Sequence, residues 1–279
     1  MNRLLRMVLC NWYRVPWMYG KLCHYAKYTD RYPEQEKWDH IHDLLRYALE
    51  AGNVDLVVTG LENLPQQDGF MLYGNHQGMF DVVAIAATCT RPLGCVLKKE
   101  LENVPLLKQI VACTKSFPMD REDVRQSLTV INAVIEEVKQ GRNYLIFPEG
   151  TRSRQGNVMG PFHGGSFRCA VKAKCPIVPI AFVDSFKVLD QKGSKRITVQ
   201  MHYLPAIAYE EYAGMAATEV AALVKGRIQA KIDECLEEHA LFVSLPILQR
   251  ILNPVNWKNI RSGVFHCLWC LAKQNIWKM

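Results

Sequence analysis

Two short strings of residues hold the side chains best suited to chemistry. Residues 75–81 read NHQGMFD, and residues 147–153 read FPEGTRS. In the first string His76 precedes a carboxylate, Asp81, by five residues. Because neighbours on a helix face are roughly three or four residues apart, these side chains meet only if His76 lies in a turn just before the helix that carries Asp81. Asp81 then orients one ring nitrogen, and the other is free to take a proton from a hydroxyl.

The residues around this histidine refine the prediction. Gly74 and Gly78 flank it, and we expect their backbone freedom to permit the turn. No serine, threonine or cysteine stands between His76 and Asp81, so a covalent relay would need a nucleophile from another part of the chain. Direct attack of an acceptor hydroxyl on an activated acyl donor needs no such group. We therefore expect a ternary complex without an acyl-enzyme.

The second string supplies groups suited to an anionic substrate. Glu149, Thr151 and Arg152 follow an apolar stretch, and Gly150 permits a turn among them. A guanidinium can bind two phosphate oxygens at once, and Arg152 is the residue placed to do so. The string therefore predicts a pocket for a phosphate-bearing substrate. His163, eleven residues beyond Arg152, is a candidate for its border.

Further basic residues lie between the two strings. Arg121 opens a helix expected over residues 121–140, where free backbone N–H groups also favour an anion. We expect Arg121 to contact a phosphate. Lys98 and Lys99 fit a substrate site and a solvated loop end equally well.

The hydrophobic pattern predicts the elements that position these residues. Apolar runs and turn residues predict strands over residues 54–59, 70–73, 95–97, 117–119, 143–147, 177–183 and 197–203. Helices are expected over residues 34–51, 81–88, 101–113, 121–140 and 218–238. Strands alternating with helices indicate an α/β fold with a mixed, largely parallel central sheet covered by helices on both faces. Both strings directly follow predicted strands, where such sheets bind ligands.

The composition limits the classes of partner. The chain has 279 residues and a net charge of +7, which suits an anionic partner and simple solubility equally. No nucleic-acid motif accompanies the charge, so we expect no nucleic-acid partner. Ten cysteines without regular spacing, and no signal peptide, favour a reduced, cytosolic-facing compartment. The sequence Cys267-Leu268-Trp269-Cys270 lacks a second pair at zinc spacing, so we expect it to pack on an apolar helix face.

The two ends of the chain differ from its middle, and we expect three regions. Residues 1–52 form an amphipathic helical region, residues 53–240 the catalytic domain, and residues 241–279 an apolar, aromatic helical tail. All six tryptophans lie near the ends, among apolar and basic residues. No run of ~20 nearly uncharged apolar residues is present to span a bilayer. Such segments are typical of helices that lie in the headgroup region, although aromatic stripes also form ordinary cores.

Four sequence blocks together resemble the glycerolipid acyltransferase family, and within it the 1-acyl-sn-glycerol-3-phosphate (lysophosphatidate) acyltransferases. Asn75-His76 with Asp81 is similar to the first block, NHxxxxD, and residues 147–153 match the third, FPEGTRS. Residues 98–121 resemble the second block and residues 176–180 the fourth. The resemblance covers roughly residues 50 to 205.

This resemblance implies roles for the residues and partners for the protein. His76 would be the general base and Asp81 its orienter. The acceptor and its phosphate would be bound by residues of the first three blocks: Asn75, Lys98, Lys99, Arg121, Glu149, Gly150, Thr151 and Arg152. The donor would be an acyl thioester, acyl-CoA or acyl-carrier protein, without a cofactor or metal. The reaction would give phosphatidate from lysophosphatidate by acylation of its sn-2 hydroxyl. From the amphipathic ends of the chain we expect attachment to the cytoplasmic face of a membrane phospholipid surface without spanning it.

Departures from the family pattern leave alternatives. Gly78 replaces a common serine, His163 a common lysine, and Lys115 or Ser116 a common glycine. Another acceptor, such as glycerol 3-phosphate or a different lysophospholipid, therefore remains open. A lipid-binding protein without turnover is a further alternative, against which the intact pair of His76 and Asp81 argues.

Overall fold

The computed structural model describes residues 3–252, with side chains up to residue 238. The chain divides into two compact units, Met1–Asp233 and Glu234–Met279. The whole sheet and every residue discussed above as part of a site belong to the first unit. In the second unit the described part is the end of a helix that stops at Leu252. The predicted tail beyond residue 252, with Cys267 and Cys270, lies outside the described residues.

A seven-stranded sheet, in the order β1-β7-β6-β2-β5-β3-β4, forms the centre of the first unit. Neighbouring strands are parallel except for β6 and β7. The α/β fold with a largely parallel sheet is therefore confirmed. The strands are β1 (Val54–Thr59), β2 (Met71–Gly74), β3 (Leu93–Lys98), β4 (Phe117–Met119), β5 (Asn143–Ile146), β6 (Ile177–Val183) and β7 (Ile197–Tyr203).

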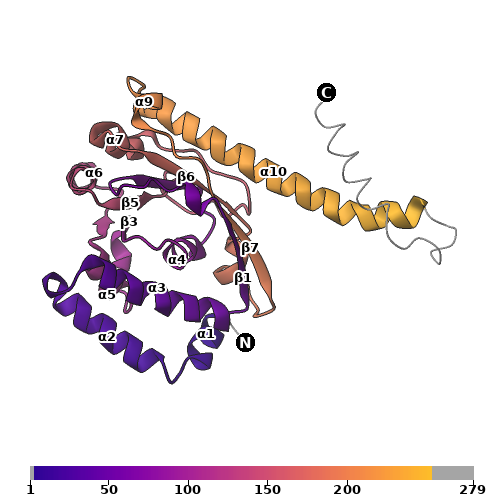
Figure 1. The fold of residues 1–279 in the computed structure, drawn as a ribbon, viewed down its shortest axis with the longest axis horizontal. Helices are drawn as coiled ribbons and strands as arrows, with labels where there is room; N and C mark the ends of the chain where they lie inside the picture. Colours follow the sequence, from indigo (N-terminus) through magenta and orange to yellow (C-terminus); the bar gives the residue numbers. More distant parts are fainter. Residues whose placement is uncertain (1–2, 253–279) are drawn as a thin grey trace. The chain divides into compact units, whose positions relative to one another are not determined.

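Helices cover both faces of the sheet (Figure 1). On one face, residues of α3 and α4 pack with alternate strand residues such as Leu72 and Val178 in one buried cluster. On the other face, Tyr73 of β2 stacks on Phe167 of α7 with ring centres 4.2 Å apart. The helices are α1 (Arg3–Cys10), α2 (Val15–Lys27), α3 (Glu34–Ala51), α4 (Phe80–Ala86), α5 (Leu107–Thr114), α6 (Val124–Lys139), α7 (Gly164–Ala173), α8 (Phe186–Leu189), α9 (Tyr209–Tyr212) and α10 (Ala217–Leu252).

Strand ends were predicted better than helix starts. Four of the strand predictions match the structure to the residue: β1, β4, β6 and β7. The helix expected over residues 121–140 begins later, at Val124, because Asp123 is its N-terminal cap and accepts from the N–H groups of Arg125 and Gln126. Arg121 therefore precedes the helix and does not open it. The helix expected over residues 101–113 is α5 alone, preceded by the 3₁₀ turn Lys99–Leu101.

The N-terminal helices pack on the domain and leave an apolar face exposed. Arg3, one of the basic residues expected at a lipid interface, is instead buried, and its guanidinium donates to the carbonyls of Val188 (3.0 Å) and Lys195 (2.8 Å). Trp38 is also buried and donates to the carbonyl of Cys89. The large apolar side chains of α1, α2 and their connection are nevertheless exposed: Leu4, Leu5, Val8, Leu9, Trp12, Tyr13, Val15 and Trp17. Among the described residues, no helix has the length and hydropathy to cross a bilayer.

Candidate active site

The turn after β2 carries the histidine and is fixed to the neighbouring strand β6. The side-chain amide of Asn75 accepts from the N–H of Phe182 (2.8 Å) and donates to its carbonyl (3.1 Å). Gly74 lies against the same residue, since a Cβ added there would be 3.2 Å from the Phe182 ring. Neither Gly74 nor Gly78 has a positive φ. The expected reason for these glycines is therefore wrong: close packing requires them, and left-handed backbone does not.

His76 and Asp81 meet as the spacing predicts. His76 lies in the turn, Asp81 lies in the first turn of α4, and Nδ1 of the ring is 2.7 Å from Oδ2 of the carboxylate. Asp81 is completely buried. Its carboxylate also accepts from the N–H groups of Gln77 (2.7 Å) and Gly78 (3.0 Å) and from the hydroxyl of Ser185.

This set of donors determines the tautomer of the histidine. Every other partner of Asp81 donates, so the carboxylate acts only as an acceptor and Nδ1 of His76 carries the proton. The opposite nitrogen, Nε2, then presents a lone pair. No described residue forms a hydrogen bond with Nε2, and the side chain is 17% exposed. The ring stacks on Phe147 at 4.2 Å, which holds its plane.

Glu149 of the second string supports the same turn. Its Oε1 accepts from the backbone N–H of His76 (2.7 Å), and its Oε2 accepts from the N–H of Gly160 (2.7 Å). The N–H of Ser153 donates in turn to the carbonyl of His76 (2.9 Å). Burial raises the pKa of Glu149, and the two N–H donors oppose that shift. The two strings are thus bound together through the backbone of the histidine.

A hollow of about 240 Å³ lies beside this turn. Gly150, at a φ of +68°, makes the turn that the sequence predicts there. His163, expected at the border, does line the hollow. The other lining residues come from the second string and the segment after it: Glu149, Thr151, Arg152, Ser153, Gln155, Gly160 and Pro161.

The other basic residues predicted for the site lie at the same edge of the sheet. Parallel strands β3 and β4 pair Lys98 with Met119, so Lys99 and Arg121 both follow the carboxyl ends of strands, as the two strings do. Lys98 pairs with Glu100 at 2.6 Å and Lys99 with Asp120 at 3.5 Å. Arg121 forms no hydrogen bond or ion pair with any described residue.

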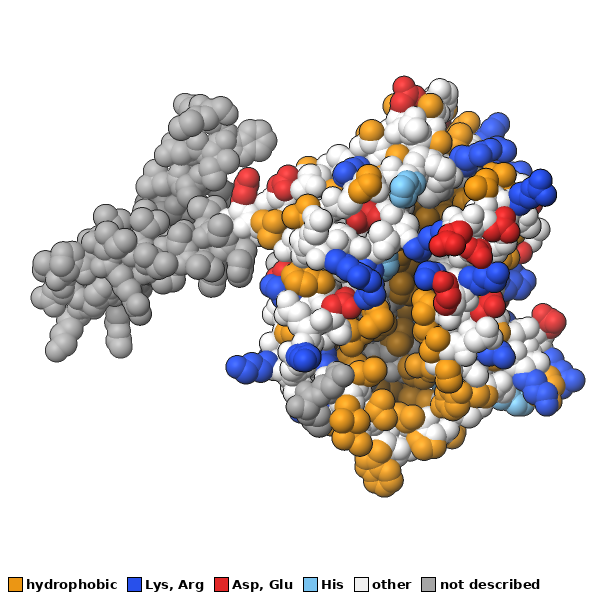
Figure 2. Space-filling model, turned by 180° about the vertical axis from the view of Figure 1, so that it is seen from behind, with side chains coloured by type: hydrophobic (Ala, Val, Ile, Leu, Met, Phe, Trp, Pro, Cys, Tyr) orange, Lys and Arg blue, Asp and Glu red, His pale blue; other side chains and the backbone are white. Residues whose placement is uncertain are grey.

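A second, apolar hollow is visible beside these charges. Figure 2 shows a deep cleft with hydrophobic side chains along its walls, histidines at its upper end, and Lys and Arg on both sides of its upper part. It extends down toward the region where α1 and α2 lie (Figure 1). A lipid with a phosphate at one end needs this combination of an apolar path and a cationic end.

Three polar residues of the site escaped the sequence analysis. Ser185 binds Asp81, Gln77 accepts from the N–H of Ser185 (3.0 Å), and Asp190 binds Arg152 (2.7 Å). Ser185 lies two residues beyond the buried strand β6, just as His76 lies two residues beyond β2 and Glu149 three beyond β5. Applying that rule to every strand would have identified Ser185.

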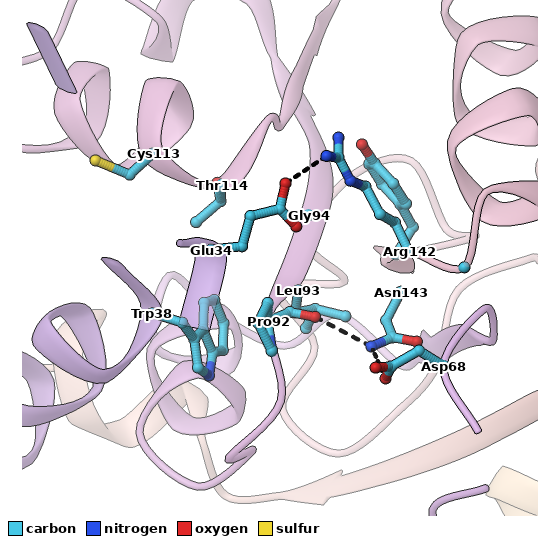
Figure 3. A pocket seen from close by; sticks show the side chains of 12 residues that line it. Glu34, Trp38, Asp68, Pro92, Leu93, Gly94, Cys113, Thr114, Arg142 and Asn143 are labelled. Carbon is cyan, nitrogen blue, oxygen red and sulfur yellow. Dashed lines mark hydrogen bonds and ion pairs between the residues drawn. The ribbon is translucent and has the colours of Figure 1, made fainter. Parts of the chain in front are cut away.

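A smaller cavity of about 70 Å³ lies at the opposite edge of the sheet, near the amino ends of β3 and β5 (Figure 3). Its charged lining is paired internally: Arg142 binds Glu34, and the Asn143 amide donates to Asp68 at 2.7 Å. None of the predicted site residues lines it. This cavity is part of the packing between α3 and the sheet.

Comparison with known proteins defines the class to which this fold and site belong. A family model described as Acyltransferase matches residues 55–183. The crystal structure of the 1-acyl-sn-glycerophosphate (LPA) acyltransferase PlsC from Thermotoga maritima has the same fold, with a TM-score of 0.68, 20% identity, and coverage of 84% of this chain and 96% of that one. The family match and the shared fold together indicate an acyltransferase domain.

Curated relatives narrow the class. The 1-acyl-sn-glycerol-3-phosphate acyltransferase of Salmonella typhimurium is 31% identical over 167 residues, which cover 60% of this chain and 68% of the relative. That of Borreliella burgdorferi is 23% identical over 191 residues, covering 68% and 76%. The chain belongs to the 1-acyl-sn-glycerol-3-phosphate acyltransferase family.

Proposed function

We propose that this enzyme transfers an acyl chain from an acyl thioester to the sn-2 hydroxyl of 1-acyl-sn-glycerol 3-phosphate, giving phosphatidate. The observation that carries the proposal is the 2.7 Å hydrogen bond between His76 Nδ1 and the buried carboxylate of Asp81. It leaves Nε2 as a base in a site bordered by cations. The names of the curated relatives support the choice of acceptor.

In the proposed mechanism His76 moves a single proton. The acceptor hydroxyl gives its proton to Nε2 as its oxygen bonds to the carbonyl carbon of the thioester. The carbon–sulfur bond then breaks, and the leaving thiolate takes the proton from Nε2. Asp81 stabilises the imidazolium that exists between the two transfers, and no covalent enzyme intermediate forms. The donor is acyl-CoA or acyl-carrier protein, without a metal or cofactor.

The acceptor phosphate is proposed to bind the cations near this base. Arg152 lines the hollow next to Glu149 and Thr151, with the turn at Gly150 between them. Arg121 has no protein partner among the described residues, so no ion pair has to break before it binds a phosphate. Lys98 and Lys99 are paired with carboxylates and, unlike Arg152, do not line the hollow, so they are weaker candidates.

The exposed face of α1 and α2 is proposed to lie on the cytoplasmic surface of a phospholipid membrane without spanning it. Trp12 is 72% exposed and Trp17 is 65% exposed, in the middle of a run of exposed Leu and Val side chains. Lys21 lies 5.7 Å from the ring of Trp17, which places a cation beside an interfacial aromatic residue. The lipid acceptor would enter the apolar cleft from this side (Figure 2).

A labelled acyl-transfer assay tests the reaction and the acceptor together. Labelled acyl-CoA and acyl-carrier protein are each offered with lysophosphatidate in liposomes, beside glycerol 3-phosphate and other lysophospholipids. His76→Ala is the test variant, and His42→Ala, a half-buried histidine on α3, is its matched control.

Each outcome of this assay separates one alternative. Phosphatidate formation that requires His76 and survives His42→Ala supports the proposal. Transfer that depends on His76 but favours another acceptor keeps the mechanism and changes the substrate. Absence of transfer from folded wild-type protein with both donors rejects the reaction in favour of lipid binding without turnover.

A further inference from the structure

Asp190 is a carboxylate beside the proposed phosphate site that no sequence block includes. It follows the one-turn helix α8, and its N–H donates to the carbonyl of Phe186 (3.2 Å). Its Oδ1 accepts from Nη1 of Arg152 at 2.7 Å, and both side chains are 30% exposed. The pair connects the segment after β6 with the FPEGTRS string.

The same carboxylate lies against the turn that carries the catalytic pair. A Cβ added to Gly78 would be 2.5 Å from Oδ2 of Asp190 and 3.1 Å from Cα of Phe186. Because the φ of Gly78 is not positive, space and not backbone strain excludes a side chain there. The N–H of Gly78 donates to Asp81 (3.0 Å), so Asp190 lies against the residue whose backbone helps to hold the carboxylate that orients His76.

The contact with Arg152 leaves most of the guanidinium free. A guanidinium has five N–H donors, and Asp190 occupies one nitrogen of Arg152. A carboxylate bound to one nitrogen of a guanidinium restricts the rotamers of the arginine side chain before an anion binds. Anion binding then costs less conformational entropy, and the remaining N–H donors stay available to the anion. The hollow lined by Arg152 is where such an anion would bind.

We propose that Asp190 is a positioning residue that holds Arg152 in the orientation that binds the acceptor phosphate, and that residue 78 is glycine because Asp190 and the backbone of Phe186 together occupy the space beside it. This inference rests on the proposed acceptor site. It accounts for the missing side chain at position 78, because a Cβ there would lie 2.5 Å from the carboxylate of Asp190.

Steady-state kinetics with lysophosphatidate as acceptor test this role. Asp190→Ala is expected to raise the acceptor KM by about tenfold, the loss typical of one charge-assisted hydrogen bond, with kcat and donor KM changed less than about threefold. Gly78→Ala is expected to raise the acceptor KM in the same way, because the new methyl group displaces the carboxylate. The double variant Gly78→Ala/Asp190→Ala should be no worse than Gly78→Ala alone, because the methyl group then meets only the backbone of Phe186 and no longer the carboxylate.

Matched controls separate positioning from loss of packing. Glu50→Ala removes a carboxylate from an exposed pair with Arg46 (3.1 Å), and Gly226→Ala adds a methyl group in open space. Neither should change the acceptor KM. If Asp190→Ala lowers both kcat and thermal stability, the residue has a structural role and the inference is overturned. Additive increases of the acceptor KM in the double variant would overturn it as well. A lower acceptor KM for Asp190→Ala would show that Asp190 competes with the phosphate, which also overturns it.

A binding measurement distinguishes failure of this inference from failure of the proposed function. Calorimetric titration with glycerol 3-phosphate needs no turnover, and Asp190→Ala and Arg152→Ala should both weaken binding by about tenfold. Wild-type activity with unchanged binding in Asp190→Ala rejects only the role of Asp190. Absence of both transfer and binding in the wild-type protein rejects the acceptor site, and the inference with it.

Discussion

The backbone N–H of His76 donates to Oε1 of Glu149 at 2.7 Å, across 73 residues of sequence. Glu149 therefore supports the histidine turn directly, in addition to lining the hollow beside it. Its second oxygen accepts from the N–H of Gly160, so each oxygen accepts from a different backbone donor. A carboxylate meets both demands, and an amide does not.

Glu149→Gln should therefore impair catalysis and stability together. Glutamine offers one carbonyl oxygen and places an NH₂ group against the other N–H donor, which costs on the order of 1–3 kcal/mol of unfolding free energy. Displacement of His76 should also lower kcat by about a hundredfold. Urea unfolding and single-turnover transfer measure the two effects, with the exposed Glu136→Gln as control. Full activity in Glu149→Gln would reject the supporting role.

Ser185→Ala tests the side-chain hydroxyl that donates to Asp81. The substitution removes one hydrogen-bond donor from the completely buried carboxylate of Asp81. Because Asp81 orients His76, the imidazole ring should then sample more orientations. We expect kcat to fall by about tenfold with the acceptor KM unchanged, because the serine touches no substrate. The assay compares Ser185→Ala with Ser194→Ala, a half-buried serine in the loop before β7. A change confined to KM would contradict this assignment.

Arg121→Ala tests a predicted phosphate contact, at a cation with no ion-pair partner within residues 3–238. Loss of a charged contact with the acceptor phosphate should raise the acceptor KM by about tenfold and leave the donor KM unchanged. Arg125→Ala, an exposed arginine in the first turn of α6, should have little effect. Lys98→Ala and Lys99→Ala should have smaller effects, since each lysine is already paired with a carboxylate. An increase in the donor KM alone would move Arg121 to the donor site.

If the exposed face of α1 and α2 binds the membrane, charged substitutions there should weaken membrane binding and leave acyl transfer in detergent intact. Trp12→Glu/Trp17→Glu should lower the partition of the protein onto anionic liposomes by at least about tenfold, because both buried apolar area and charge attraction are lost. Sedimentation with liposomes measures this, and turnover in detergent micelles should persist. Val124→Glu is the matched control, at a side chain that is 71% exposed on α6. Equal sedimentation of all three proteins would reject this surface as the attachment site.

The buried imidazole of His40 predicts a loss of stability in acid. Burial lowers its pKa, with Lys21 acting in the same direction and the Met18 carbonyl and Asp43 opposing it. Below the unfolded pKa of about 6.5, the unfolded chain takes up a proton that the folded chain resists, so stability falls as pH decreases through that value. The urea midpoint should therefore fall between about pH 7.5 and 5.5. His40→Gln should flatten this dependence and His42→Gln should not; equal slopes in all three proteins would contradict it.

Local pattern determined the parts of this protein that depend on short stretches of chain. The limits of α3, β1 and β6 follow from apolar periodicity and turn residues. The contact between His76 and Asp81 also follows from local sequence, because a turn and one helical turn span the five residues between them. The family resemblance rests on the same short strings.

Only the tertiary structure decided which distant groups complete the site. Ser185 reaches Asp81 across 104 residues and Glu149 reaches His76 across 73, because β6 and β5 lie on either side of β2. Every residue of these three strands is buried. Their apolar sequences therefore predict that the strands are central in the sheet but not which strands are neighbours. The space that Gly78 leaves for Asp190 depends on that same order. Hydrophobic burial thus determines the elements along the chain, whereas the order of the strands determines which residues contact the turn that carries His76.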